Sequence, residues 1–258
     1  MKLQIESTTA CNAKCTFCPR YEMTRPMGEM SDELFYKIVK EGKEMEVKHF
    51  LPFLNGEPFV FSRIWEWLDY LERQKVWVTL YTNAELIDVD RLLKHKNIYL
   101  VNCSLNATTK ETSNKVMRGI DFDKAVKNTQ DLISKSRFRV RVSMVVNEDT
   151  VNEVDDFKNI WGEHAVVNNY ANWGGARHST LEKKKIRKYC ERTLQDITIL
   201  WDGRVNMCCM DYDGKAIFGD INKESLKDIS KRIEVIRELH RARNYTMIPC
   251  RDCNFMTL

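Results

Sequence analysis

The sequence has few residues that break regular structure and no long apolar run. Its 258 residues include ten glycines and five prolines, too few for a collagen-like or low-complexity chain. No apolar stretch approaches the roughly 20 residues that cross a bilayer. The first residues, MKLQIESTTACN, turn polar after Ile5 and carry no secretion signal. We therefore expect a cytoplasmic protein without a membrane span.

A large excess of charge of one sign is also missing. The 41 basic and 37 acidic residues leave a net charge of +4, which is too balanced to indicate a nucleic-acid partner. The basic runs LEKKKIRKYCER and RELHRARN fit charged helix faces, because acidic residues are interleaved along most of the chain. A nucleic-acid-binding or zinc-stabilised interaction protein remains an alternative, and metal and sulfide analysis would distinguish it.

Cysteine is the exception in this ordinary composition. In a reducing cytosol, nine cysteines, an odd number, indicate metal ligands or catalytic groups more than disulfides. They form two groups, one near each end of the chain, with Cys103 alone between them. The groups are Cys11, Cys15 and Cys18, and then Cys190, Cys208, Cys209, Cys250 and Cys253. The sequence therefore predicts two separate sites.

Short apolar runs alternate with longer amphipathic stretches from Leu3 to Tyr170. The expected strands are Leu3–Ser7, His49–Leu54, Val76–Tyr81, Tyr99–Asn106, Phe138–Val146 and Ala165–Tyr170. The expected helices are a helix capped by Ser31 that runs to Met45, and then Ile64–Gln74, Phe122–Ser134 and Thr150–Trp161. This alternation predicts an α/β protein with six right-handed β/α repeats around a parallel sheet, two short of a closed barrel.

The character of the sequence changes near Ser179, which divides the chain into residues 1–178 and 179–258. After it, two short strands flank Asp202-Gly203, a strong hairpin signal. Ser225 then opens a helical segment towards Asn244. This part is too short to form a large hydrophobic core, and it holds five cysteines. We therefore expect a small domain that is stabilised by a bound metal or an iron–sulfur cluster.

The first cysteine group is a C-x3-C-x2-C triplet in the loop after the first strand. Structural zinc takes four ligands, and no fourth Cys or His lies nearby. A [4Fe–4S] cluster held by three cysteines leaves one iron free for a non-protein ligand. With aromatic Phe17 before its last cysteine, the triplet resembles the signature of the radical S-adenosylmethionine (SAM) enzymes.

That resemblance implies a partial (β/α)6 TIM-type barrel in which SAM chelates the free iron through its amino and carboxylate groups. One electron from the cluster, supplied by a flavodoxin- or ferredoxin-type reductant, then cleaves SAM to methionine and a 5′-deoxyadenosyl radical. The first cysteine group, Cys11, Cys15 and Cys18, would hold this cluster.

The resemblance also implies which residues contact SAM. The segment NGEP at 55–58 looks like the motif that receives the SAM amino group, since Gly56 lets the backbone approach and Glu57 adds a negative acceptor. Alternation in the fourth strand puts its polar residues on the inward face, where Ser104 and Asn106 resemble ribose- or carboxylate-binding positions. Cys103, on the other face, is expected to be a buried inert thiol. The implied SAM-contacting residues are Phe17, Gly56, Glu57, Thr82, Ser104 and Asn106.

The second cysteine group supplies four thiolates and ends in Pro-Cys-Arg-Asp-Cys. Read alone, it would favour zinc slightly over iron–sulfur. Residues 199–222 and 249–253 instead resemble the SPASM/twitch extension of radical SAM enzymes, which carries auxiliary [4Fe–4S] clusters. We expect one auxiliary cluster, since the chain stops at Leu258, before the further cysteines of a full SPASM domain. The implied ligands are Cys190, Cys208, Cys250 and Cys253.

A fully ligated cluster has no open iron to grip a substrate, so its natural role is to move an electron. This favours a radical SAM oxidoreductase, a dehydrogenase in which a base removes a proton and the auxiliary cluster accepts an electron. Candidates for the base are Arg141, Tyr170 and Asp211. Cys209 stays open as an alternative ligand, a hydrogen-atom donor or a bystander thiol.

The substrate follows by resemblance only. The layout is similar to that of the butirosin-pathway aminocyclitol dehydrogenase, which implies a sugar, polyol or aminocyclitol. The alternative is modification of a ribosomally synthesised peptide by a thioether or carbon–carbon crosslink or by epimerisation. Against it, we find no leader-peptide module before the barrel, although a separate protein could supply one.

Overall fold

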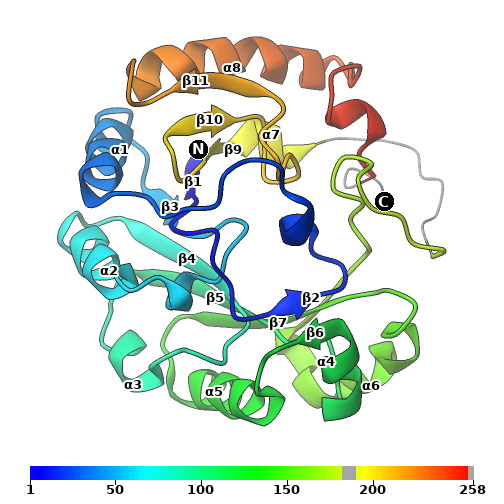
Figure 1. Cartoon of the computed structure of the whole chain (residues 1–258). Helices are drawn as coiled ribbons and strands as arrows, with labels where there is room; N and C mark the ends of the chain where they lie inside the picture. Colours follow the sequence, from blue (N-terminus) through cyan, green and yellow to red (C-terminus); the bar gives the residue numbers. More distant parts are fainter. Residues whose placement is uncertain (182–189, 255–258) are drawn as a thin grey trace.

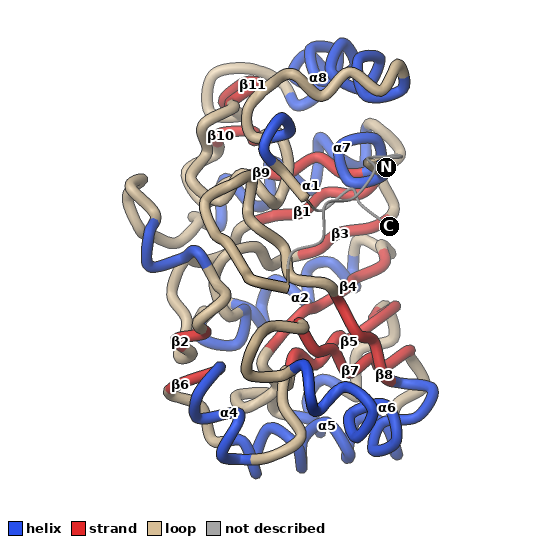
Figure 2. Tube along the Cα trace, turned by 90° about the vertical axis from the view of Figure 1, so that its right-hand side faces the viewer, coloured by secondary structure: helices blue, strands red, loops and turns tan. Residues whose placement is uncertain are grey.

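The computed structural model describes residues 1–181 and 190–254, and it shows an α/β protein (Figure 1). The strands of the main sheet are β1 (Lys2–Ile5), β3 (His49–Leu51), β4 (Trp77–Thr82), β5 (Ile98–Ser104), β7 (Arg139–Val145), β8 (Ala165–Asn168), β9 (Asp196–Ile199), β10 (Arg204–Asn206) and β11 (Ile217–Asp220). They lie side by side in the order β11-β10-β9-β1-β3-β4-β5-β7-β8, as Figure 2 shows from top to bottom. Two further short strands, β2 (Lys14–Cys15) and β6 (Met117–Arg118), pair with each other.

Most of the helices cover the outer face of this sheet (Figure 1). The helices of the described residues are α1 (Asp32–Glu44), α2 (Ile64–Arg73), α3 (Val89–Leu92), α4 (Lys110–Val116), α5 (Phe122–Lys135), α6 (Val154–Trp161), α7 (Glu191–Gln195) and α8 (Leu226–Arg241). Short 3-10 turns lie at Pro19–Glu22, Pro58–Val60, Val151–Glu153, Gly162–His164 and Cys250–Asp252. The Ser31 side chain accepts a hydrogen bond from the Leu34 amide and so caps α1 as the sequence predicts. None of the described helices is both long and apolar enough to span a lipid bilayer.

The six predicted parallel strands are all present as β1, β3, β4, β5, β7 and β8, with each neighbouring pair parallel. This confirms the predicted partial barrel, whose active side lies at the carboxyl ends of the strands. In β5, Cys103 packs outward in the core, and burial raises the pKa of its thiol to about 12. Asn102 points inward and donates to the Ser143 hydroxyl at 2.7 Å. The predicted alternation of β5 is therefore confirmed.

The C-terminal hairpin continues the barrel sheet. The pairing of β9 with β10 is antiparallel, as Asp202-Gly203 predicts, but β9 also pairs in parallel with β1, where Leu3 lies opposite Ile197. The helix predicted after Ser225 is α8, whose apolar side packs with the main core through Leu226, Ile229 and Ile233. The hairpin is thereby fixed against the strand that precedes the first cysteine group.

His49, at the start of β3, gives the fold a pH dependence. Its ring lies 2.7 Å from the Thr79 hydroxyl. Burial, with a smaller contribution from Lys2, lowers the pKa of His49 from 6.5 to about 4. Between these values the unfolded chain binds a proton that the folded chain excludes, so stability falls as the pH falls.

We expect the free energy of unfolding to drop by about 1 kcal/mol between pH 7 and pH 5 on account of His49, after allowance for its partial exposure. His49→Gln should flatten this slope, because it removes the titrating ring. Urea unfolding of both proteins at the two pH values measures the effect, and equal slopes would contradict the prediction.

Candidate active site between two cysteine groups

The first cysteine group lies in loop 6–31, which joins β1 to α1. Cys15 is fixed by the β2–β6 pairing, opposite Met117. The Arg20 guanidinium, nearly fully buried, is 3.4 Å from the carbonyls of Thr9 and Ala13 and closes the loop on itself. The local fold thus turns three nearby thiols towards one space.

The electrostatics of these thiols suit a metal centre. Burial raises the pKa of Cys11 to about 11. The pKa of Cys15 is raised well above its usual value, mainly by burial and to a smaller extent by the neighbouring thiols Cys18 and Cys11. Three thiolates this close repel one another unless a cation neutralises them, and soft thiolates are the ligands of iron–sulfur clusters. The donor set therefore fits the predicted [4Fe–4S] cluster.

One cavity of about 600 Å³ connects this group to the C-terminal part of the chain, and we call it the main cavity. Its volume suits a cofactor together with a small substrate. Both ends of the chain contribute to its wall: the first cysteine group lies on one side, and Cys209 and Arg192 lie on another. All six residues predicted to contact SAM also line it, namely Phe17, Gly56, Glu57, Thr82, Ser104 and Asn106.

The 55–58 segment forms a tight cradle beside the first cysteine group. A Cβ atom on Gly56 would lie 2.3 Å from the Thr8 carbonyl oxygen and 2.6 Å from that of Ala10, so only glycine fits there. The Glu57 amide donates to the Ala10 carbonyl at 2.9 Å. These contacts bind the Glu57 backbone directly to the strand end that leads into Cys11.

The Glu57 carboxylate is buried and held by three donors. The Thr82 hydroxyl donates to Oε1 at 2.7 Å, and the Asn83 amide donates to Oε2 at 2.8 Å. The Phe59 amide also donates to Oε1, at 3.2 Å. Burial nevertheless raises the pKa of Glu57 to about 7. An ammonium group bound here would restore the charged form of the carboxyl, which is the chemistry expected of the SAM amino group.

Four of the five cysteines of the second group line a neighbouring, much smaller cavity. They are Cys190, Cys208, Cys250 and Cys253, of which Cys190 also lines the main cavity. Burial and then the neighbouring thiols Cys209, Cys250 and Cys253 raise the pKa of Cys208 well above its usual value. A closed set of four soft donors fits a fully ligated cluster, as the sequence predicts.

Cys209 faces the main cavity instead of this smaller one. The Arg192 guanidinium, on α7, donates to its sulfur at 3.0 Å. The two adjacent cysteines stand at a turn after β10, which the Asp211 amide closes by donating to the Cys208 carbonyl at 3.1 Å, and they line different cavities. This arrangement supports Cys208 as the ligand.

We expect Cys208→Ala to lose the iron of the auxiliary cluster, about four atoms per chain. Cys209→Ala should keep that iron, since its sulfur faces the other cavity. Iron and sulfide analysis of the two anaerobically purified variants checks this. Iron loss in Cys209→Ala with retention in Cys208→Ala would reverse the assignment.

The three residues predicted as bases lie outside the set that lines the main cavity. Arg141 is an exposed residue of β7. Tyr170 follows β8, and its carbonyl accepts a hydrogen bond from Asn254. Asp211 is buried and accepts hydrogen bonds from the amides of Lys215 and Ala216, which shape its own loop. Their catalytic roles remain predictions.

Several polar residues that were not predicted as site residues also line the main cavity, among them Tyr81, Arg192 and Asp196. Asp196, the first residue of β9, has a buried Oδ1 without a hydrogen-bond partner among the described residues. Arg192 and Asp196 belong to α7 and β9, just after Cys190. Only their nearness in sequence to a predicted ligand could have indicated them.

Curated relatives match the barrel. Mycofactocin maturase MftC of Mycobacterium tuberculosis is 30% identical over 154 residues, which are 59% of this chain and 39% of that protein. GTP 3′,8-cyclase of Clostridium botulinum is 25% identical over 174 residues, 64% of this chain and 53% of the enzyme. The chain thus spans between about two fifths and half of the length of these relatives.

Solved structures share the fold over nearly the whole chain. BtrN in complex with AdoMet and 2-DOIA has a TM-score of 0.63 at 14% identity, covering 98% of this chain and 92% of BtrN. Streptococcus suis SuiB bound to precursor peptide SuiA has a TM-score of 0.73 at 16% identity, covering 99% and 70%. Native anSMEcpe with bound AdoMet has a TM-score of 0.70 at 20% identity, covering 93% and 83%. At these identities the likeness shows the fold.

Family models match the two parts of the chain that carry the cysteines. Residues 190–254 match the iron–sulfur cluster-binding SPASM domain. Residues 5–159 match the radical SAM superfamily. The protein binds SAM and a [4Fe–4S] cluster in its barrel, and its C-terminal part binds auxiliary iron–sulfur. With the predicted barrel, both cysteine groups and a model that matches more than half of the sequence in agreement, the chain belongs to the radical SAM superfamily.

Proposed function

We propose that the protein is a radical SAM oxidoreductase that removes two electrons from a small polar substrate such as a polyol, sugar or aminocyclitol. The observation that carries this proposal is the main cavity, which runs from the first cysteine group to Cys209 and Arg192, beside the second group. A substrate bound there lies between a radical-generating centre and an electron acceptor. A flavodoxin- or ferredoxin-type donor would supply the initiating electron.

The two sets of cysteine ligands and Glu57 have separate roles in this proposal. Cys11, Cys15 and Cys18 would hold the SAM-binding cluster, which when bound with SAM would supply the radical chemistry. Cys190, Cys208, Cys250 and Cys253 would hold the auxiliary cluster, which would serve as the acceptor of the remaining electron. Glu57 and the cradle around it orient SAM.

The proton that leaves with the electron needs an acceptor at the cavity wall. Asp196 has the required position, since it lines the main cavity and its Oδ1 has no hydrogen-bond partner among the described residues. Burial raises the pKa of this carboxyl, which brings it towards the range of a general base near neutral pH. We therefore prefer Asp196 to the three residues named from the sequence.

The test is incubation of the reduced enzyme with SAM and a panel of deuterated polyols, sugars and aminocyclitols. Deuterium in 5′-deoxyadenosine together with a ketone product supports dehydrogenation. Cys208→Ala should still cleave SAM but form little ketone. Deuterium transfer with no net oxidation of any substrate in the panel would contradict the proposal.

The second candidate function is modification of a peptide, in which Cys209 returns a hydrogen atom during epimerisation. Cys209 supports it, because its sulfur faces the main cavity, and SuiB was solved with its precursor peptide. In this case Cys209→Ala would keep normal SAM cleavage and lose epimerised product. Dehydrogenation would instead survive this substitution.

A further inference from the structure

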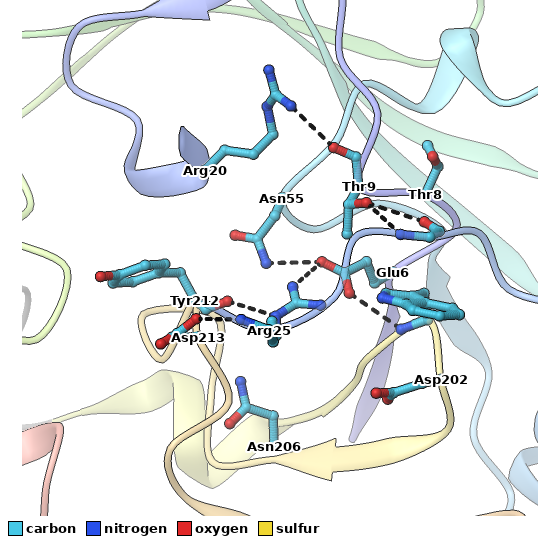
Figure 3. Close-up of polar contacts among 12 residues, drawn as sticks. Glu6, Thr8, Thr9, Arg20, Arg25, Asn55, Asp202, Asn206, Tyr212 and Asp213 are labelled. Carbon is cyan, nitrogen blue, oxygen red and sulfur yellow. Dashed lines mark hydrogen bonds and ion pairs between the residues drawn. The ribbon is translucent and has the colours of Figure 1, made fainter. Parts of the chain in front are cut away.

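Residues 24–28 of loop 6–31 lie against the C-terminal hairpin, which is far from them in sequence. Figure 3 shows Arg25 at the centre of this contact, between Glu6 on one side and Tyr212 and Asp213 on the other. We call these residues and their partners the 24–28 joint. Its members come from the barrel and from the C-terminal part.

Arg25 makes the central contacts of the joint. Its Nη2 donates to Glu6 Oε1 at 2.6 Å, and its Nε donates to the Tyr212 carbonyl at 2.9 Å. The side chains of Arg25 and Glu6 are 3% and 0% exposed. One guanidinium therefore binds the residue after β1 and the loop after β10 together in a buried position.

Asp213 and Trp201 hold the neighbouring residues of the same segment. The Asp213 carboxylate accepts hydrogen bonds from the Thr24 amide at 2.6 Å and the Thr24 hydroxyl at 2.7 Å. The Trp201 indole donates to the Pro26 carbonyl at 3.0 Å, and its ring lies so close to Gly28 that a Cβ there would approach it to 2.6 Å. Three independent contacts thus fix the segment to the hairpin.

Glu6 extends the joint to the SAM side. The Asn55 amide group donates to Glu6 Oε1 at 2.9 Å, and the Trp201 amide donates to Oε2 at 3.2 Å (Figure 3). Asn55 directly precedes the Gly56–Glu57 cradle, and Tyr212 follows Cys208 and Cys209 in the same loop. The joint therefore connects the cradle with the loop that carries the auxiliary ligand.

Stability alone explains this arrangement poorly. A buried ion pair gains little over apolar packing, because two charges lose their hydration. Arg25 also leaves Nη1 buried without a hydrogen-bond partner among the described residues, which costs free energy. What a rigid guanidinium fork does well is to fix two partners at one relative geometry.

We propose that Arg25 is a positioning residue that sets the loop of Cys208 and Cys209 against the SAM cradle, and so fixes the separation of the two cluster sites. It touches neither SAM nor a cluster ligand. The proposal stands on the two cluster sites alone and is independent of the substrate.

The test compares Arg25→Met and Arg25→Lys with the reconstituted wild-type enzyme. We expect both to keep the full iron content, while amide hydrogen exchange in 24–28 and 211–216 rises at least tenfold. The spin–spin interaction between the two reduced clusters in electron paramagnetic resonance should weaken. Arg25→Met should lower Tm, and Arg25→Lys should recover most of that loss because it restores the charge beside Glu6. Lysine cannot restore the second contact, to the Tyr212 carbonyl.

A matched control is Arg232→Met, which removes a guanidinium that donates to the Phe218 carbonyl within the C-terminal part. It should leave exchange in 24–28 and the spin interaction unchanged. If Arg25→Met lowers Tm while both readouts stay as in the wild type, Arg25 is merely structural and the proposal fails.

A second variant covers the case in which Arg25→Met does not fold. Asp213→Asn keeps the Glu6–Arg25 pair and weakens the hydrogen bonds that the carboxylate accepts from the Thr24 amide and hydroxyl and from the Arg25 amide. It should raise exchange in the same two segments severalfold and weaken the spin interaction in the same direction. Wild-type behaviour in this variant would overturn the proposal.

Discussion

Replacing Cys11, Cys15 and Cys18 together by alanine is expected to abolish SAM cleavage and to remove about four of about eight irons per chain. Cys190, Cys208, Cys250 and Cys253 line the smaller cavity, so the auxiliary cluster should persist. Anaerobic iron and sulfide analysis, with assay of 5′-deoxyadenosine, measures both effects.

The matched control is Cys103→Ala, which removes a thiol from the barrel core. It should keep all of the iron and full SAM cleavage, at a cost in stability of about 1 kcal/mol for a small cavity. Loss of both clusters in the triple variant would show that the two sites fold as one unit and would contradict the expected independence.

Glu57→Gln is expected to weaken SAM binding by roughly 10- to 100-fold, the range for losing a hydrogen bond to a charged group. The amide oxygen can still accept from Thr82 and Phe59 at the Oε1 position, but the bond from the Asn83 amide to Oε2 is lost. What is lost is the negative charge that would face the SAM amino group. Equilibrium dialysis of reconstituted enzyme with SAM measures the affinity.

The pH dependence identifies the cause. Since burial raises the pKa of Glu57 to about 7, the free carboxyl is increasingly protonated below that pH. SAM affinity should therefore fall by up to about tenfold per pH unit below 7 and level off above it. In Glu57→Gln this part of the profile should be flat.

Glu72→Gln is the control for a carboxylate outside the main cavity, where Glu72 contacts His95 on the surface of α2. It should leave SAM affinity and its pH profile unchanged. A wild-type profile in Glu57→Gln would show that another group governs the dependence.

Local patterns were enough to predict the barrel. The six strands and four of the helices between them, α1, α2, α5 and α6, follow from alternation, apolar periodicity and caps such as Ser31, which act over a few residues. The shorter helices α3 and α4 were not predicted. The pairing of β9 with β1 could not be predicted in this way. The pairing depends on which edge of the sheet is still unpaired when the hairpin forms. The local sequence around Ile197 does not indicate that edge.

The site shows the same limit. The cysteines, Gly56 and Glu57 could be predicted because they belong to short sequence motifs whose spacing indicates their chemistry. Asp196 and Arg25 could not, since Asp196 matters through an unpartnered oxygen at a cavity wall, and Arg25 through partners at Glu6 and Tyr212. Such contacts exist only after distant segments have met.

The place of β1 between β3 and β9 has a consequence for folding during synthesis. Leu3 leaves the ribosome long before its partner Ile197. One edge of β1, and with it Glu6, stays unpaired until β9 and the hairpin emerge. Because such long-range parallel pairing forms slowly, the loop of the first cysteine group reaches its final shape only after the hairpin has been synthesised.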